Sequence, residues 1–145
     1  MPTRNLNVFH VQTGDNVLSF TQKNVADWYF RNIPSNCSRN IEWTEDESYC
    51  AKQVSNEVQF FETSNFAKGV HSRIKTEGIQ SYSLSPGKRP IVAIFIAGKG
   101  SSPSSAKLYD FNSNFSVPLT QKSFFRADRV NFHWNKIGNF FSLLI

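Results

Sequence analysis

Residues 41–62, IEWTEDESYCAKQVSNEVQFFE, contain the pattern that decides the fold. Short runs of aromatic and β-branched residues lie on either side of an acidic turn and of a second, shorter turn. Such runs, bounded by turn-forming residues, favour antiparallel strands. The stretch therefore predicts three strands joined by tight turns.

Two features of this stretch recur along the chain. Similar hairpins start 41 and 50 residues apart, at Trp43, Leu84 and Trp134. Aromatic pairs that precede a polar or acidic residue recur at intervals of 52 and 48 residues, around Phe9, Phe61 and Tyr109. Four strands that repeat every ~40–50 residues are typical of the blades of a β-propeller.

Two expected strands have the apolar patterns that stacked blades require. The stretch PIVAIFIAG, residues 90–98, is apolar without alternation, which predicts a strand covered on both faces. Val130, Phe132 and Trp134 instead alternate with polar residues, which predicts a strand with one buried face. Both patterns fit antiparallel blades packed face to face.

Counting strands predicts an all-β chain that is part of a propeller. Residues 5–20 are expected to end one blade, 41–77 and 79–126 to form two complete blades, and 129–145 to begin another. A propeller closes with about four or more blades. We therefore expect the fold to need further blades or self-association to close, and the chain alone to aggregate or form oligomers.

The charge is unevenly distributed. Residues 1–67 contain 5 Lys and Arg against 8 Asp and Glu, whereas residues 68–145 contain 11 against 3. A strongly basic half suggests a polyanionic partner. The alternative is that these cations only solvate the outer faces of strands.

The segment QKSFFRADRVNFHWNK, residues 121–136, places cations between aromatic rings. RNA is bound in this way, with cations on phosphate and rings stacked on bases. The candidate RNA contacts are Lys122, Arg126, Arg129, His133 and Lys136. The rings have an alternative role, as core between blades; they are Phe124, Phe125, Phe132 and Trp134.

Two other polar stretches have simpler interpretations. IAGKGSSPSS, residues 96–105, resembles a phosphate-binding loop, but it lacks the GxxxxGK[ST] spacing and the helix that would follow, so a hairpin tip is expected. An acidic cluster marks the first hairpin turn and is either solvated or faces a basic protein. It consists of Glu42, Glu45, Asp46 and Glu47.

No catalytic or metal-binding pattern is evident in the sequence, so a non-enzymatic protein without a cofactor is expected. The histidines show no metal-ligand spacing with the cysteines; these residues are His10, His71, His133, Cys37 and Cys50. The first ten residues lack the apolar run of a secretory signal. The apolar runs are far shorter than the ~20 residues that span a bilayer. We expect a cytoplasmic protein with free thiols and no membrane partner.

Several motifs occur in an order that resembles one family. They are NLNVFHVQTG, LSFTQKNVADW, WTEDESYCAKQVSNEVQFFE, SLSPG, AKLYDF, KSFFRADRV and WNK. Together they resemble the central, WD-repeat-like β-propeller region of eukaryotic translation initiation factor 2A, the single-chain factor. The resemblance extends from about residue 5 to residue 145, and the order of NEVQFFE, SLSPG and KSFFRADRV is its most specific part.

The resemblance implies a role in initiating and regulating protein synthesis. Members of this family bring initiator methionyl-tRNA to the small ribosomal subunit without GTP, so the implied partners are these two, mRNA and other initiation factors. One alternative is a propeller scaffold that binds proteins, such as the propeller of an initiation factor 3 subunit. Another is a nucleotide-using enzyme built around residues 96–105.

Overall fold

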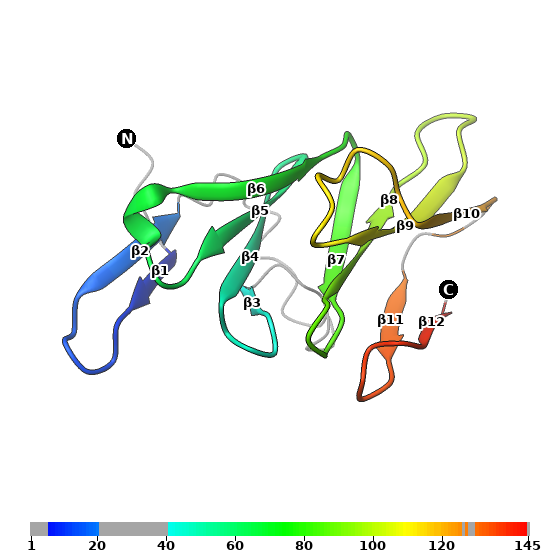
Figure 1. The fold of residues 1–145 in the computed structure, drawn as a ribbon. Helices are drawn as coiled ribbons and strands as arrows, with labels where there is room; N and C mark the ends of the chain where they lie inside the picture. Colours follow the sequence, from blue (N-terminus) through cyan, green and yellow to red (C-terminus); the bar gives the residue numbers. More distant parts are fainter. Residues whose placement is uncertain (1–5, 21–40, 126, 128–129, 145) are drawn as a thin grey trace.

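The computed structural model describes residues 6–20, 41–125, 127 and 130–144, which form four antiparallel sheets in a row (Figure 1). The first sheet pairs β1 (Leu6–Phe9) with β2 (Asn16–Phe20). The second has the order β3 (Glu42–Trp43), β4 (Tyr49–Val54), β5 (Glu57–Glu62) and β6 (Val70–Lys75). A 3₁₀-helix, η1 (Phe66–Lys68), lies between β5 and β6.

The third sheet repeats the up-and-down order of the second. It consists of β7 (Ile79–Leu84), β8 (Ile91–Ile96), β9 (Ser104–Asp110) and β10 (Thr120–Phe124). The fourth pairs β11 (Asn131–Trp134) with β12 (Phe141–Leu144). The described residues are thus almost entirely β-structure, with η1 as their one helical turn.

Strand register places equivalent residues of the sequence repeat at equivalent positions in the sheets. The residue that starts each hairpin pairs with a residue of the second strand. In the two four-stranded sheets, that second residue pairs in turn with an aromatic residue of the third strand. The rows are Trp43–Cys50–Phe61, Leu84–Val92–Tyr109 and Trp134–Phe141. The two repeats found in the sequence are therefore one repeated arrangement of neighbouring strands.

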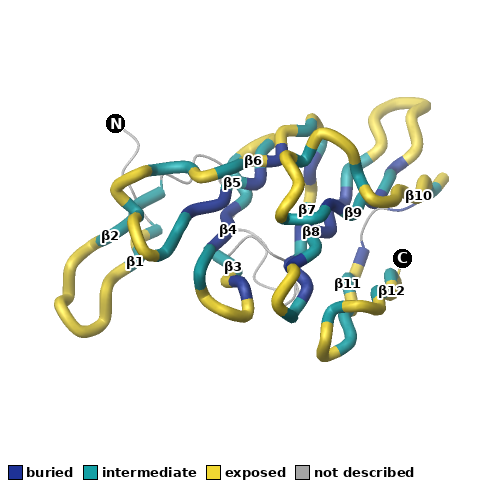
Figure 2. Tube along the Cα trace, viewed as in Figure 1, coloured by how far each residue is buried: buried dark blue, intermediate teal, exposed yellow. Residues whose placement is uncertain are grey.

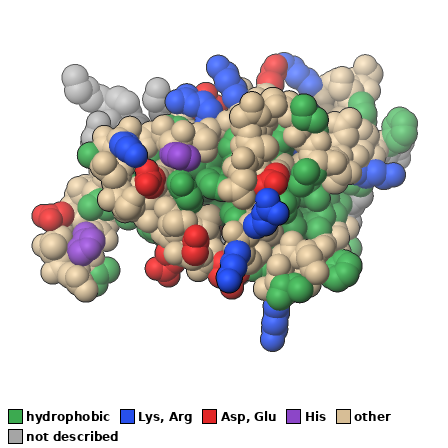
Figure 3. Space-filling view, in the orientation of Figure 1, with side chains coloured by type: hydrophobic (Ala, Val, Ile, Leu, Met, Phe, Trp, Pro, Cys, Tyr) green, Lys and Arg blue, Asp and Glu red, His purple; other side chains and the backbone are tan. Residues whose placement is uncertain are grey.

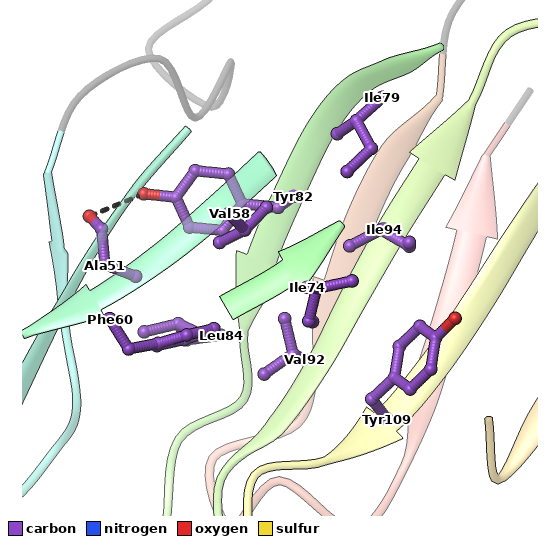
Figure 4. Close-up of a cluster of buried hydrophobic side chains, with 10 residues drawn as sticks. All are labelled: Ala51, Val58, Phe60, Ile74, Ile79, Tyr82, Leu84, Val92, Ile94 and Tyr109. Atoms are coloured by element: carbon purple, nitrogen blue, oxygen red, sulfur yellow. Dashed lines mark hydrogen bonds between the residues drawn. The ribbon is translucent and has the colours of Figure 1, made fainter. Parts of the chain in front are cut away.

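The main hydrophobic core lies between the second and third sheets (Figure 4). It is formed by Ala51, Val58, Phe60, Ile74, Ile79, Tyr82, Leu84, Val92, Ile94 and Tyr109. The Tyr82 hydroxyl donates a 2.8 Å hydrogen bond across this boundary to the carbonyl of Ala51. Buried residues concentrate in these two sheets, whereas the β1–β2 hairpin is mostly exposed or half-buried (Figure 2).

Strand β8 is buried on both faces, as its sequence predicts. Val92 and Ile94 belong to the core shared with the second sheet. Phe95, with its side chain on the opposite face of the strand, packs with Ala127 and Val130 in a second core. Because neighbouring sheets cover both faces, the strand needs no polar alternation.

Strand β11 is buried on one face, again as predicted. Phe132 is half-buried against the second core, and the Trp134 indole N–H donates a 3.0 Å hydrogen bond to the Ser83 hydroxyl. Asn131 and His133 are exposed. The interpretation of Phe125 as core is wrong: the residue is 98% exposed, and it lies just beyond the end of β10 at Phe124.

Candidate nucleic-acid interface

The structure separates the predicted RNA contacts. Lys122 is exposed on the outer strand β10, His133 is exposed on β11, and Lys136 is exposed in the β11–β12 turn. Figure 1 shows β10 and this turn at opposite ends of the last two sheets. Arg126 and Arg129 lie outside the described residues. The three described candidates therefore do not form one compact patch.

Lys122 stands beside an apolar groove between the third and fourth sheets. The groove has a volume of about 280 Å³ and is lined by Ala106, Leu108, Thr120, Gln121, Lys122, Phe124, Phe141 and Leu143. That volume is just below the lower limit of ordinary small-molecule sites, ~300 Å³. The lining is mainly apolar and contains one charged group, the Lys122 ammonium.

Contact between two hairpin turns brings together a second group of cationic side chains. A methyl group added at Gly87 would lie 2.9 Å from the Ile137 carbonyl oxygen, and one added at Gly138 would overlap the Pro86 carbonyl oxygen. Both glycines have positive φ, +100° and +71°, which suits glycine best. Backbone contact therefore holds the β7–β8 turn against the β11–β12 turn.

These two turns present Lys88, Arg89 and Lys136, all exposed, which we call the basic rim. Both turns lie at the bottom of the view in Figure 1, and Figure 3 shows Lys and Arg side chains projecting on this side of the molecule. The ion pairs between described residues involve none of the three, so their charges are available to an anion. Exposed Ile137 and Phe140 lie in the same β11–β12 turn.

The motif at residues 121–136 points to Lys136 but not to Lys88 and Arg89. The signal was present in the repeat: Leu84 and Trp134 start equivalent hairpins, so the turns that follow them lie at the same end of neighbouring sheets. Combining that repeat with the charges of SPGKR and WNK identifies the basic rim.

The acidic hairpin turn is only partly solvated, because two of its carboxylates bind the next sheet. The Glu42 carboxylate accepts a 2.9 Å hydrogen bond from the Leu84 N–H of the next sheet, and burial raises its pKa to about 7. The Glu45 carboxylate accepts a hydrogen bond from the Gly87 N–H of the same neighbouring sheet's turn. Treating Glu42 as a solvated or protein-facing group is therefore wrong, because its carboxylate joins two sheets.

Asp46 stabilises the same turn through hydrogen bonds to other residues of the turn. Its carboxylate accepts hydrogen bonds from the Thr44 hydroxyl at 2.7 Å and from the Ser48 hydroxyl and N–H at 2.8 and 3.1 Å. The Thr44 hydrogen bond, followed by those from Ser48, lowers the pKa of Asp46. Asp46 and Glu47 are exposed, as expected for a solvated turn.

Residues 96–105 form the tip of the β8–β9 hairpin, as predicted, and lead directly into a strand. The Ser104 hydroxyl accepts a 2.9 Å hydrogen bond from the Gly98 N–H and donates a 3.0 Å hydrogen bond to the Ala127 carbonyl. Lys99 pairs with Glu77 at 3.4 Å. The loop thus lacks the helix N-terminus on which a phosphate-binding loop depends.

The other chemically notable residues do not form a site. Within the described part of the chain, no three His, Cys, Asp or Glu side chains gather as metal ligands. Cys50 is a buried free thiol whose pKa is raised to about 11 by burial, and Cys37 lies outside the described residues. Among the residues that the structure describes, no helix is long and apolar enough to cross a membrane.

Comparison with known proteins decides the relationship that the sequence motifs suggest. No protein-family model matches the chain. Over 144 residues, 99% of the chain, it is 42% identical to eukaryotic translation initiation factor 2A of Schizosaccharomyces pombe. The chain is homologous to a segment of eukaryotic translation initiation factor 2A. It spans 23% of the length of that relative.

A solved structure supports the same relationship. The crystal structure of a eukaryotic initiation factor matches 99% of the chain with a TM-score of 0.84 and 40% identity, and the chain covers 33% of it. With the sheets described above, this match confirms the all-β, partial propeller architecture. A weaker similarity, 27% identity over 100 residues, links the chain to a component of eukaryotic translation initiation factor 3 from Anopheles gambiae; it covers 69% of the chain and 14% of that protein. The resemblance to the initiation factor 2A family is therefore confirmed.

Proposed function

We propose that the chain is a propeller segment that helps to deliver initiator methionyl-tRNA to the small ribosomal subunit without GTP. The observation that carries this proposal is 42% identity to initiation factor 2A along nearly the whole chain. In this role the chain works in the cytoplasm with mRNA and other initiation factors and regulates translation. It acts by binding rather than by catalysis.

The basic rim is the part of the surface we propose for contact with RNA phosphates. Lys88, Arg89 and Lys136 are exposed on two turns whose backbones touch, so little ordering of the backbone is needed on binding. Lys122 and His133 are proposed as further contacts on the last two sheets. Each cation on phosphate releases counterions, which makes the affinity depend on salt.

Binding of fluorescently labelled initiator tRNA across a salt series tests this assignment. We expect affinity to fall steeply between about 50 and 200 mM salt. The triple variant Lys88→Gln/Arg89→Gln/Lys136→Gln should lower the slope of log affinity against log salt by about 2 to 3, since each phosphate contact contributes roughly one.

A matched triple variant provides the control. Lys68→Gln/Lys75→Gln/Lys99→Gln removes the same charge from exposed positions on η1, β6 and the β8–β9 tip. It should leave the slope nearly unchanged. Equal effects of the two triple variants would contradict the basic rim as the contact surface. An absence of tRNA binding, with salt-insensitive capture of a protein, would favour the scaffold alternative.

A further inference from the structure

The β7–β8 turn, which carries two of the three cations of the basic rim, is held by the acidic hairpin of the neighbouring sheet. The Glu42 carboxylate accepts a hydrogen bond from the Leu84 N–H, and the Glu45 carboxylate accepts one from the Gly87 N–H. Two carboxylates of one hairpin therefore bind two backbone donors of the next. Both hairpins belong to the four-stranded second and third sheets.

Gly87 links the acidic hairpin to the basic rim. It directly precedes Lys88 and Arg89 in the chain, and its φ of +100° suits glycine best. A methyl group added at Gly87 would lie 2.9 Å from the Ile137 carbonyl oxygen, in the turn that carries the third cation of the rim. The Gly87 backbone thus contacts both the Glu45 carboxylate and the β11–β12 turn. The positions of the rim's cations therefore depend on how firmly this residue is held.

A carboxylate beside a phosphate-binding surface is unfavourable by charge alone. Like charges repel, so the Glu45 charge by itself weakens the binding of RNA at the rim. Nor does Glu45 pair with the cations of the rim, because the ion pairs between described residues join other side chains. What Glu45 contributes is its hydrogen bond to the Gly87 N–H, which acts on the backbone of the turn.

We propose that Glu45 is a positioning residue of the basic rim. Its carboxylate fixes the Gly87 backbone and, through it, holds Lys88 and Arg89 in the arrangement that binds RNA phosphate. This inference rests on the proposed function, since it concerns the same surface. A turn that is already fixed loses less conformational freedom on binding than a mobile one, so the anchor raises the affinity for RNA. It thereby offsets the repulsion between the Glu45 carboxylate and phosphate.

Paired substitutions separate the anchor from the charge. Glu45→Gln removes the charge but keeps a side-chain oxygen that can accept from the Gly87 N–H, whereas Glu45→Ala removes both. Glu47 is the matched control position, because it is exposed in the same turn and its carboxylate makes no hydrogen bond to any described residue. Glu47→Gln and Glu47→Ala therefore both remove a charge without removing an anchor.

The affinities of the four variants for initiator tRNA are measured at one fixed salt concentration. We expect Glu45→Ala to bind about two- to tenfold more weakly than Glu45→Gln, which is the cost of ordering a freed turn. Glu47→Ala and Glu47→Gln should bind equally. Equal affinities of the two Glu45 variants would overturn the proposal, and so would the same difference at both positions.

Amide hydrogen exchange without RNA separates this proposal from the proposed function. The Gly87 amide should exchange faster in Glu45→Ala than in Glu45→Gln, because only the first variant frees it. Amides of the buried strand β8 should exchange equally in both, which shows that both are folded. Equal exchange at Gly87, or a loss of protection throughout the chain, would overturn a local positioning role. Faster exchange at Gly87 together with no tRNA binding by the unmodified chain would instead overturn the proposed function and, with it, the role of Glu45 in binding RNA.

Discussion

At the scale of single residues, Tyr82 joins the second and third sheets. Its side chain is fully buried, and its hydroxyl donates to the Ala51 carbonyl at 2.8 Å. Tyr82→Phe removes the donor and leaves a buried carbonyl without it, so we expect a loss of about 1–2 kcal/mol in the free energy of unfolding, measured with urea. Tyr109→Phe is the control, because that hydroxyl makes no hydrogen bond to any described residue. Equal losses in both variants would contradict the assigned role.

Glu42 gives the stability a dependence on pH. Its pKa in the folded protein is about 7, above the ordinary value of 4.5, because its carboxylate is buried. The folded state therefore binds more protons than the unfolded state between these values, and stability falls as pH rises from 4.5 through 7. The effect is at most about 3 kcal/mol.

Glu42→Gln removes this titration while retaining an oxygen that can accept from the Leu84 N–H. Relative to the unmodified protein, the variant should gain stability steadily between about pH 5 and pH 8. Urea unfolding at fixed protein concentration across that range measures the difference. A constant difference at every pH would show that Glu42 does not titrate in this range.

At the scale of elements, contact between hairpin turns sets how neighbouring sheets align. Gly138 combines a φ of +71° with close approach to the Pro86 carbonyl. Gly138→Ala should destabilise the protein by more than the ~1 kcal/mol expected for backbone strain alone. Gly14→Ala is a matched control, since its φ is +74° and nothing lies within 4 Å of the added methyl. Similar melting temperatures for the two variants would contradict a specific turn-to-turn contact.

Individual strands and turns also show which features of the structure could be predicted from the sequence. The uninterrupted apolar run in β8 and the alternation in β11 predicted their burial correctly, because these patterns follow from strand geometry. The burial of Glu42 and the position of Lys88 were missed, because each depends on a partner more than 40 residues away. Phe125 was misjudged because nothing local marks where β10 ends.

At the scale of the whole molecule, the repeat explains the order of the described strands and sheets. Two complete sheets stand between two half sheets, and the exposed rings of Phe9 and Phe140 lie in those half sheets or their turns. The family was predictable because several motifs occur in one order. The basic rim was not predicted, since it forms only when two sheets stand side by side.

The most direct test of the proposed function is the ratio of affinities for initiator and elongator methionyl-tRNA, measured with the 145-residue chain at one fixed salt concentration. Both RNAs offer similar phosphate charge, so nonspecific electrostatic binding affects both equally. We predict tighter binding of initiator tRNA, and we expect the triple variant of the basic rim to weaken it. Equal affinities for the two RNAs would contradict a part for this chain in selecting initiator tRNA.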